Sequence, residues 1–212
     1  FRHPDFKINR QPGYIMKLHL GSGKRVLEGF THIDIGRFDH IDFQSPIDKL
    51  EMFDSNVADL IYCSHSLEYF DRFQTEAALT EWLRVLKPGG LLHVAVPDFE
   101  ALAKWYLQSN DLDAVHGPLF GRWPVAGSTD IIYHKSAWDF ESLSRVLGAV
   151  GFEAVDKYDP VEFLASLDNE FDDYSLAFLP HHDRSGTQIS LCLSAQKGFE
   201  ANRGEGNSAH GL

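Results

Sequence analysis

The chain has 212 residues, 43% of them hydrophobic and 24% charged, which suits one globular domain with a sizeable core. Its formal net charge of -12 argues against nucleic acid as a partner, because proteins that neutralise phosphates carry a basic face. No segment approaches the ~18 apolar residues of a membrane span, and residues 1–15 lack the apolar core of a signal peptide. We therefore expect a cytoplasmic protein without a membrane partner.

The first half of the chain alternates short apolar runs with turns, and one longer segment has helical spacing. In residues 75–86 the apolar side chains recur every three or four positions, which predicts a helix capped by Thr75. The following Lys87-Pro88-Gly89-Gly90 predicts the end of that helix. The apolar runs predict strands over residues 18–20, 30–35, 40–43 and 59–64.

The second half repeats this alternation. It predicts a strand over residues 91–96, a helix over 141–150 that Gly151 ends, and a late strand over 189–195. Alternating strands and helices predict an α/β fold: a Rossmann-like, mostly parallel sheet with flanking helices and a late antiparallel strand. The ligand crevice of such a sheet lies at the carboxyl ends of its parallel strands.

A glycine pair and an acid follow the first two predicted strands. Gly21-Ser22-Gly23 comes directly after residues 18–20, and Asp34 stands near the end of the next strand. Glycine permits positive φ and lets a ligand approach the backbone, and a carboxylate can accept hydrogen bonds from both hydroxyls of a ribose. A lone Gly-x-Gly also occurs in ordinary tight turns. The combination with Asp34 therefore carries the prediction of a nucleoside-containing cofactor.

The spacing after this turn disfavours a dinucleotide. Arg25 stands near the place of a third glycine, and residues 24–29 are too few for a full crossover helix. A pyrophosphate needs the amino terminus of such a helix. A cofactor without a pyrophosphate tolerates the shorter turn.

Several segments, taken in chain order, resemble those of a known protein family. They are LHLGSGKRVLEGFTHIDI (18–35), DLIYCSHSLEYF (59–70), EWLRVLKPGGLLHVAVPDF (81–99), LGAVGF (147–152) and ISLCLSAQK (189–197). In these the chain resembles the class I S-adenosylmethionine-dependent methyltransferases, of the short bacterial type with an abbreviated first helix. The resemblance implies S-adenosylmethionine as cofactor and a small-molecule or glycan-type acceptor as partner. The alternatives are a non-catalytic S-adenosylmethionine-binding protein and, from another class, a nicotinamide-dependent oxidoreductase.

The resemblance also implies a domain organisation. We expect an N-terminal extension over residues 1–15, a methyltransferase domain over 16–198 and a disordered tail over 199–212. A less regular segment within the domain, at about 105–140, is expected to cover the crevice mouth on the acceptor side.

The same resemblance implies roles for residues at the ends of the first two strands. Gly21, Ser22 and Gly23 would line the methionine portion of the cofactor. Asp34 would hold the ribose hydroxyls, and Ile35 would flank the adenine.

Further cofactor contacts are implied after the third and fourth strands. Asp42 is our choice for the acid that contacts the adenine amine, with Ser45 and Asp48 as alternatives. Ser64 and His65 would lie beside the cofactor.

The motif after the fourth strand departs from the family pattern. The family commonly has His-x-Leu-Glu-His there, whereas residues 65–69 read His-Ser-Leu-Glu-Tyr, so that Tyr69 replaces the second histidine. Any chemistry of that histidine in relatives is in doubt here. Glu68 is expected to tie down a loop or cap a helix.

Acceptor-side roles remain open among a few side chains. A hydroxyl acceptor needs a base, for which the candidates are His65, Asp98 and His134, although Asp98 also fits a helix N-cap. Arg122, His134 and Trp138 are candidates for acceptor binding, with a plain surface role as the alternative for Arg122. A carboxylate acceptor would need no base. We expect no metal site, because the adjacent His181-His182-Asp183 has no further ligands nearby in the sequence.

Overall fold

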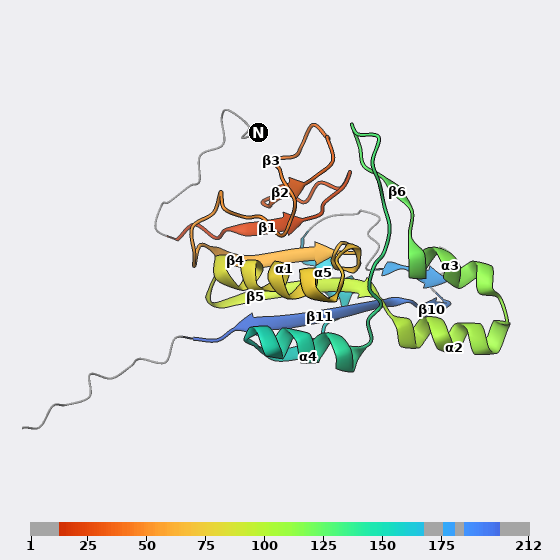
Figure 1. The fold of residues 1–212 in the computed structure, drawn as a ribbon. Helices are drawn as coiled ribbons and strands as arrows, with labels where there is room; N and C mark the ends of the chain where they lie inside the picture. Colours follow the sequence, from red (N-terminus) through yellow and green to blue (C-terminus); the bar gives the residue numbers. More distant parts are fainter. Residues whose placement is uncertain (1–12, 168–175, 181–184, 200–212) are drawn as a thin grey trace, which may run out of the picture.

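The computed structural model describes residues 13–167, 176–180 and 185–199. Most of the expected N-terminal extension and tail, and His181-His182-Asp183, lie outside these residues. The centre of the molecule is a seven-stranded sheet with the order β3-β2-β1-β4-β5-β11-β8 (Figure 1). Its strands are β1 (Lys17–Leu20), β2 (Thr31–Asp34), β3 (Phe43–Gln44), β4 (Ala58–Ser64), β5 (Leu86–Pro97), β8 (Phe152–Lys157) and β11 (Ser190–Lys197).

The predicted sheet is confirmed. Neighbouring strands from β3 to β5 are all parallel, and β11 pairs antiparallel with both β5 and β8. The parallel strands therefore present their carboxyl ends at one edge, on the right of Figure 1. Two short hairpins lie outside this sheet, β6 (Trp123–Pro124) with β7 (Ile131–Ile132), and β9 (Phe178–Leu179) with β10 (Thr187–Gln188).

Helices cover both faces of the sheet. The helices are α1 (Arg72–Val85), α2 (Phe99–Ser109), α3 (Leu112–Phe120), α4 (Phe140–Val150) and α5 (Pro160–Ala165), with a 3-10 turn η1 (Leu67–Tyr69). Buried side chains of β1, β2 and β4, such as Leu18, Ile33 and Ile61, share one core with α1 and α4. Tyr62 packs on the opposite face with Leu164 of α5. Helices α2 and α3 lie beyond the carboxyl ends of the strands (Figure 1).

The boundaries of α1 differ from the sequence prediction. The helix begins at Arg72 with Asp71 as N-cap, whose carboxylate accepts from the N–H groups of Phe73 and Gln74. Thr75 therefore lies inside the helix, and its predicted capping role is wrong. The helix ends at Val85, and the Lys-Pro-Gly-Gly segment that follows is already part of β5.

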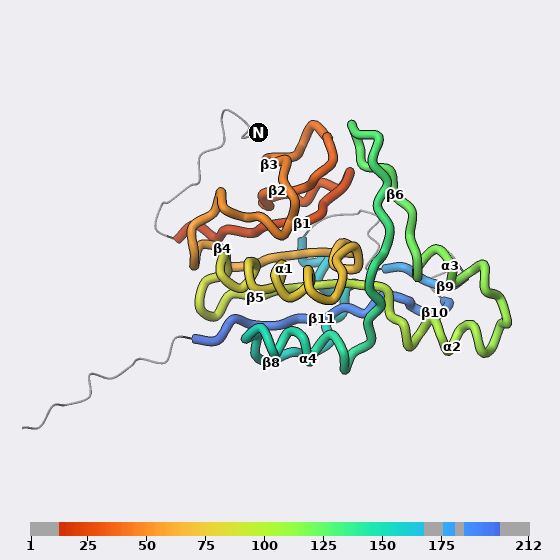
Figure 2. The backbone as a smooth tube through the Cα atoms, in the orientation of Figure 1, coloured from red at the N-terminus to blue at the C-terminus, as the bar shows by residue number. Residues whose placement is uncertain are grey.

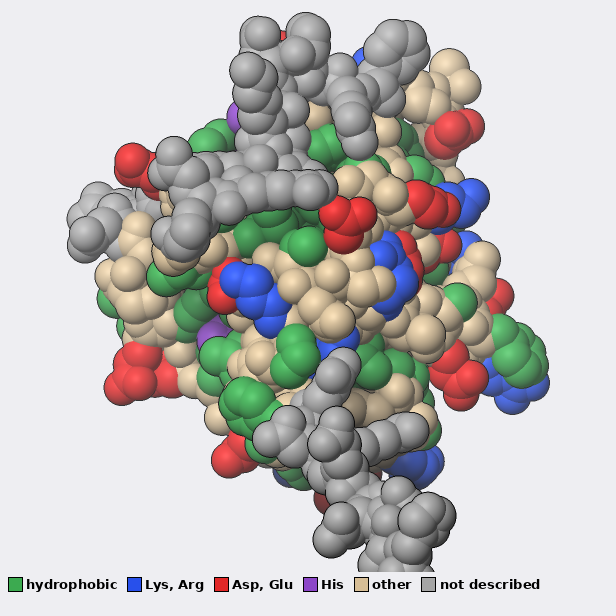
Figure 3. Space-filling view, turned by 90° about the vertical axis from the view of Figure 1, so that its left-hand side faces the viewer, with side chains coloured by type: hydrophobic (Ala, Val, Ile, Leu, Met, Phe, Trp, Pro, Cys, Tyr) green, Lys and Arg blue, Asp and Glu red, His purple; other side chains and the backbone are tan. Residues whose placement is uncertain are grey.

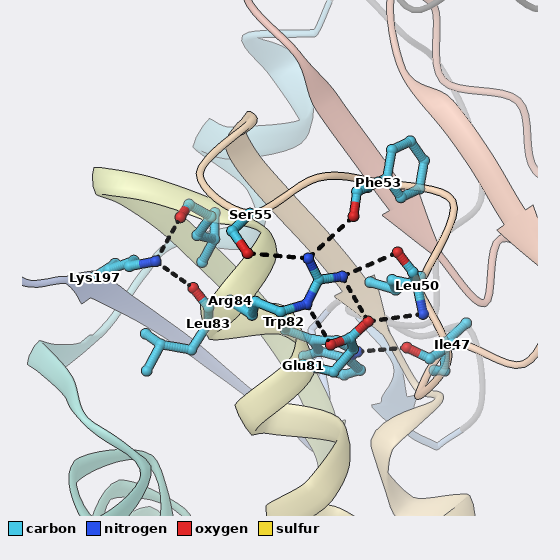
Figure 4. A network of polar contacts seen from close by, with 10 residues as sticks. Ile47, Leu50, Phe53, Ser55, Glu81, Trp82, Leu83, Arg84 and Lys197 are labelled. Carbon is cyan, nitrogen blue, oxygen red and sulfur yellow. Dashed lines mark hydrogen bonds and ion pairs between the residues drawn. The ribbon is translucent and has the colours of Figure 1, made fainter.

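Side chains of α1 hold the loop between β3 and β4 (Figure 4). Arg84 donates to the carbonyl oxygens of Leu50 and Phe53 at 3.1 and 3.0 Å, and Glu81 accepts from the Leu50 N–H at 3.0 Å. The hydrogen bond from Arg84 lowers the pKa of the Glu81 carboxyl below its ordinary value. This network fixes the loop between β3 and β4.

The face at the amino ends of the parallel strands has no single kind of charge. Figure 3 shows Lys and Arg side chains there among acidic and apolar ones. Within the described residues, no helix has the length and apolar character that crossing a membrane requires.

Candidate active site

A cavity of about 1470 Å³ lies at the carboxyl ends of the parallel strands. One wall follows β1, β2 and β4, and the other comes from α2, α3 and the β6–β7 hairpin. Figure 2 shows the hairpin segment rising beside the loops that follow β1 and β2. The Arg37 N–H donates to the Ala126 carbonyl at 2.9 Å, which ties the hairpin to the β2 side of the cavity.

Gly21 and Gly23, which follow β1, are explained by different features of the structure. Gly21 has φ +66°, and an added Cβ would lie 2.1 Å from the Ser66 hydroxyl oxygen. Gly23 has φ +55°, and an added Cβ would meet nothing within 4 Å. Both line the cavity. Gly21 therefore serves close packing of the chain, whereas Gly23 leaves open space where a ligand can approach the backbone.

The Asp34 carboxylate is held in a fixed orientation at the cavity wall. Its Oδ2 accepts from the Gly23 N–H at 2.8 Å, and its Oδ1 accepts from the Gly36 N–H at 2.6 Å. Each carboxylate oxygen has a further lone pair, so both can accept hydrogen bonds from a ligand at once. This arrangement fits two neighbouring hydroxyls of a ribose.

The Ser22 hydroxyl is another polar group at the cavity. Its side chain is 2% exposed, lines the cavity, and its hydroxyl has no hydrogen bond among the described residues. Ser64, at the end of β4, also lines the cavity. Buried polar groups are normally satisfied, so the Ser22 hydroxyl indicates a bound polar group.

Of the two residues expected to contact the adenine, Ile35 lies at the cavity and Asp42 does not. Ile35 lines the cavity beside Phe38, and its side chain is 37% exposed. Asp42 does not line the cavity: its Oδ2 accepts from the His32 N–H at 2.8 Å. The reason is that β3 begins at Phe43, later than expected, so that Asp42 precedes the strand. The alternatives Ser45 and Asp48 also lie outside the cavity lining.

Three titratable side chains meet at the cavity wall. The Glu68 side chain is 1% exposed, and its Oε1 lies 3.3 Å from His65 Nδ1 and 3.8 Å from His134 Nε2. All three residues line the cavity, beside Tyr69. The sequence motif at 65–69 pointed to His65, but it gave no sign that Glu68 would lie near His134, which is distant in sequence.

Of the remaining candidates for acceptor-side roles, one lines the cavity and two do not. Arg122 is exposed and lines the cavity. Asp98 does not line it and caps α2, because its Oδ1 accepts from the Ala101 N–H at 3.1 Å. Trp138 is 6% exposed and belongs to the main hydrophobic core, so the structure does not bring it to the cavity. Trp105 was missed by the sequence reasoning: it lines the cavity, and its indole N–H has no partner among the described residues.

Part of the chain matches a known protein family. Residues 31–94 match a family model described as a methyltransferase domain. A search of the curated proteins gave no significant match. This family match favours a methyltransferase over a nicotinamide-dependent oxidoreductase.

Solved structures share the fold at low identity. A SAM-dependent methyltransferase from Methanosarcina mazei is 19% identical, with 87% of this chain and 93% of that chain covered and a TM-score of 0.51. The 1,6-didemethyltoxoflavin-N1-methyltransferase of Burkholderia thailandensis is 14% identical, with 86% and 71% covered and a TM-score of 0.52. A SAM-dependent methyltransferase from Archaeoglobus fulgidus is 15% identical, with 87% of each chain covered and a TM-score of 0.50. Residues 31–94 thus match a methyltransferase domain, and the chain shares its fold with S-adenosylmethionine-dependent methyltransferases.

Proposed function

We propose that this methyltransferase acts on a small-molecule or glycan-type acceptor, and that the cofactor lies along β1 and β2. The observation that carries the cofactor placement is the Asp34 carboxylate, which two backbone N–H groups orient toward the cavity. Gly21, Ser22 and Gly23 would line the methionine portion of the cofactor, and Ile35 the adenine. Bound S-adenosylmethionine supplies an activated methyl group on a sulfonium that is a good leaving group.

The size of the cavity supports a second, small ligand. Pockets for one drug-sized molecule have volumes of roughly 300–1000 Å³, and this cavity has about 1470 Å³. The acceptor side carries exposed aromatic side chains, Phe120, Trp123 and Tyr133, and the cation of Arg122. The B. thailandensis neighbour, which has the same fold, was crystallised with a small heterocyclic acceptor and S-adenosylhomocysteine. These features fit a compact ring-containing acceptor.

The protein contributes mainly alignment and exclusion of water. The hydrogen bond from the Arg37 N–H to the Ala126 carbonyl holds the β6–β7 hairpin against the β2 side of the cavity, so that in this proposal cofactor and acceptor meet between these two walls. Holding two reactants in line accelerates displacement without covalent participation of the protein. In this proposal the acceptor lies beside His65 and His134, which line the cavity.

The test is calorimetric binding of S-adenosylhomocysteine to the wild type, Asp34→Ala and Asp39→Asn. Asp34→Ala removes two charged hydrogen bonds to the ribose, each worth about 1.5–3 kcal/mol, so we expect the affinity to fall by roughly 100-fold or more. Asp39 is exposed on the same loop and outside the cavity lining, so Asp39→Asn should bind like the wild type. A folded wild type that does not bind S-adenosylhomocysteine would contradict the cofactor placement.

A further inference from the structure

Glu68 is a buried carboxylate that the proposed cofactor site does not use. Its side chain is 1% exposed, and neither carboxylate oxygen accepts a hydrogen bond among the described residues. Taking a carboxylate out of water without donors is costly, so such a group usually compensates a nearby positive charge or binds a ligand. Its carboxylate lies close to two imidazoles, those of His65 and His134.

The protonation of His134 follows from its partner on the other side of the ring. Nδ1 lies 2.9 Å from the carbonyl oxygen of Pro118, which can only accept a hydrogen bond. In the neutral ring the proton is therefore on Nδ1, and Nε2 carries a lone pair. That nitrogen lies 3.8 Å from Glu68 Oε1, too far for a direct hydrogen bond. Nε2 is thus free to take a proton at the cavity wall.

The surroundings hold the His134 ring in this orientation. Tyr69 packs edge-on against it, with ring centroids 4.9 Å apart. Gly121 leaves the space that the ring fills, because an added Cβ there would lie 2.5 Å from Nε2. The base is therefore preorganised, as general acid–base catalysis requires.

His65 approaches the same carboxylate oxygen of Glu68. Its Nε2 lies 2.8 Å from the Ser190 hydroxyl, and its Nδ1 lies 3.3 Å from Glu68 Oε1. One carboxylate oxygen thus has two imidazoles nearby. A proton taken up by either ring is compensated by the negative charge of Glu68.

We propose that His65, Glu68 and His134 form a proton-accepting cluster and that the methyl acceptor presents an O–H or N–H nucleophile. The inference rests on the proposed function and specifies its substrate class. The acceptor's proton moves to His134 Nε2 as its oxygen or nitrogen forms the bond to the methyl carbon, and the electron pair of the broken carbon–sulfur bond stays on sulfur. Glu68 is a positioning residue that stabilises the imidazolium. A carboxylate nucleophile is disfavoured, because it would face the negative charge of Glu68.

The first test measures the protonation of the histidine rings in the cluster and does not require catalysis. Nitrogen-15 NMR of the histidine rings, with S-adenosylhomocysteine present and at a pH where the rings are neutral, reports which nitrogen carries the proton. We expect His134 with its proton on Nδ1. A proton on Nε2 would overturn the proposal, because the ring would then have no lone pair at the cavity. A wild type that fails to bind S-adenosylhomocysteine contradicts the proposed function instead, and the ring measurement on the free protein still decides this inference.

The second test measures methyl transfer to three probes: a phenol, an aniline and a benzoic acid. We expect transfer to the phenol or the aniline and not to the acid. In Glu68→Gln, which keeps the side-chain size, kcat should fall by roughly 100-fold or more while the affinity for S-adenosylhomocysteine stays within about twofold. Glu68→Asp should recover part of the rate. Glu76→Gln, at an exposed position of α1, is the matched control and should behave like the wild type. Transfer to the benzoic acid, or an unchanged kcat in Glu68→Gln, would overturn the proposal.

Discussion

At the scale of single residues, Gly21 and Gly23 share a backbone conformation but should differ in how much an alanine there destabilises the fold. Both have positive φ, but an added Cβ at Gly21 would meet Ser66, whereas one at Gly23 would meet nothing. A positive φ at alanine costs about 1 kcal/mol, and overpacking costs a further ~1–3 kcal/mol. We therefore expect Gly21→Ala to lower the free energy of unfolding by about 2–4 kcal/mol and Gly23→Ala by about 1 kcal/mol. Urea denaturation measures both, and equal effects would mean that the Ser66 contact is relieved at no cost.

His93, on β5, makes stability depend on pH. Its ring stacks on Tyr158 with centroids 4.4 Å apart, and burial lowers its pKa from 6.5 to about 4. The unfolded chain therefore takes up this proton at a higher pH than the folded one. The corresponding stability is complete above pH 6.5 and is lost as the pH falls from 6.5 toward 4.

His93→Phe removes this titration and keeps an aromatic ring against Tyr158. Because one pKa unit corresponds to about 1.4 kcal/mol, the wild type should lose about 2 kcal/mol more than the variant between pH 7.5 and pH 5. Urea denaturation of both proteins at the two pH values measures the difference. Parallel losses would show that His93 titrates normally in the folded protein.

Single residues also show the limit of the sequence prediction of the site. Asp34 was predictable, because an acid at the end of a parallel strand needs only local information to be placed at the crevice. Asp42 was not, because its position depended on a strand of two residues whose start was misjudged. The environment of Glu68 needs His134, which comes 66 positions later and reaches it only through the tertiary fold.

At the scale of elements, the regular parts of the fold were the predictable ones. Strands β1, β2 and β4 and the body of α1 follow from apolar runs and helical spacing, because buried elements require them. The amino end of α1 was missed, because Asp71 to Gln74 contribute a capping box and no apolar periodicity. Segments with mixed polarity, such as α3 with its internal Pro118, acquire their structure from packing on α2.

At the scale of the whole molecule, the cavity joins two parts that are far apart in the sequence. The sheet edge supplies Asp34, and the β6–β7 hairpin reaches it through the hydrogen bond from Arg37 N–H to the Ala126 carbonyl. A ligand that occupies the space between them should stabilise both at once. Some local opening motions require the ligand to leave. The free energy of such an opening should rise by about 2.7 kcal/mol when the ligand concentration is 100 times its dissociation constant.

Hydrogen exchange tests this coupling. With S-adenosylhomocysteine at that concentration, we expect exchange in peptides spanning residues 34–38 and 123–132 to slow together, by up to roughly 100-fold where opening the amide requires ligand release. The Gly151 N–H, which lies at the carboxyl end of α4 and donates to the Leu147 carbonyl, belongs to an element outside the cavity lining and serves as the internal control. Protection confined to 34–38 would mean that the hairpin opens independently of the cofactor. The cavity would then be closed on the acceptor side only when the acceptor binds.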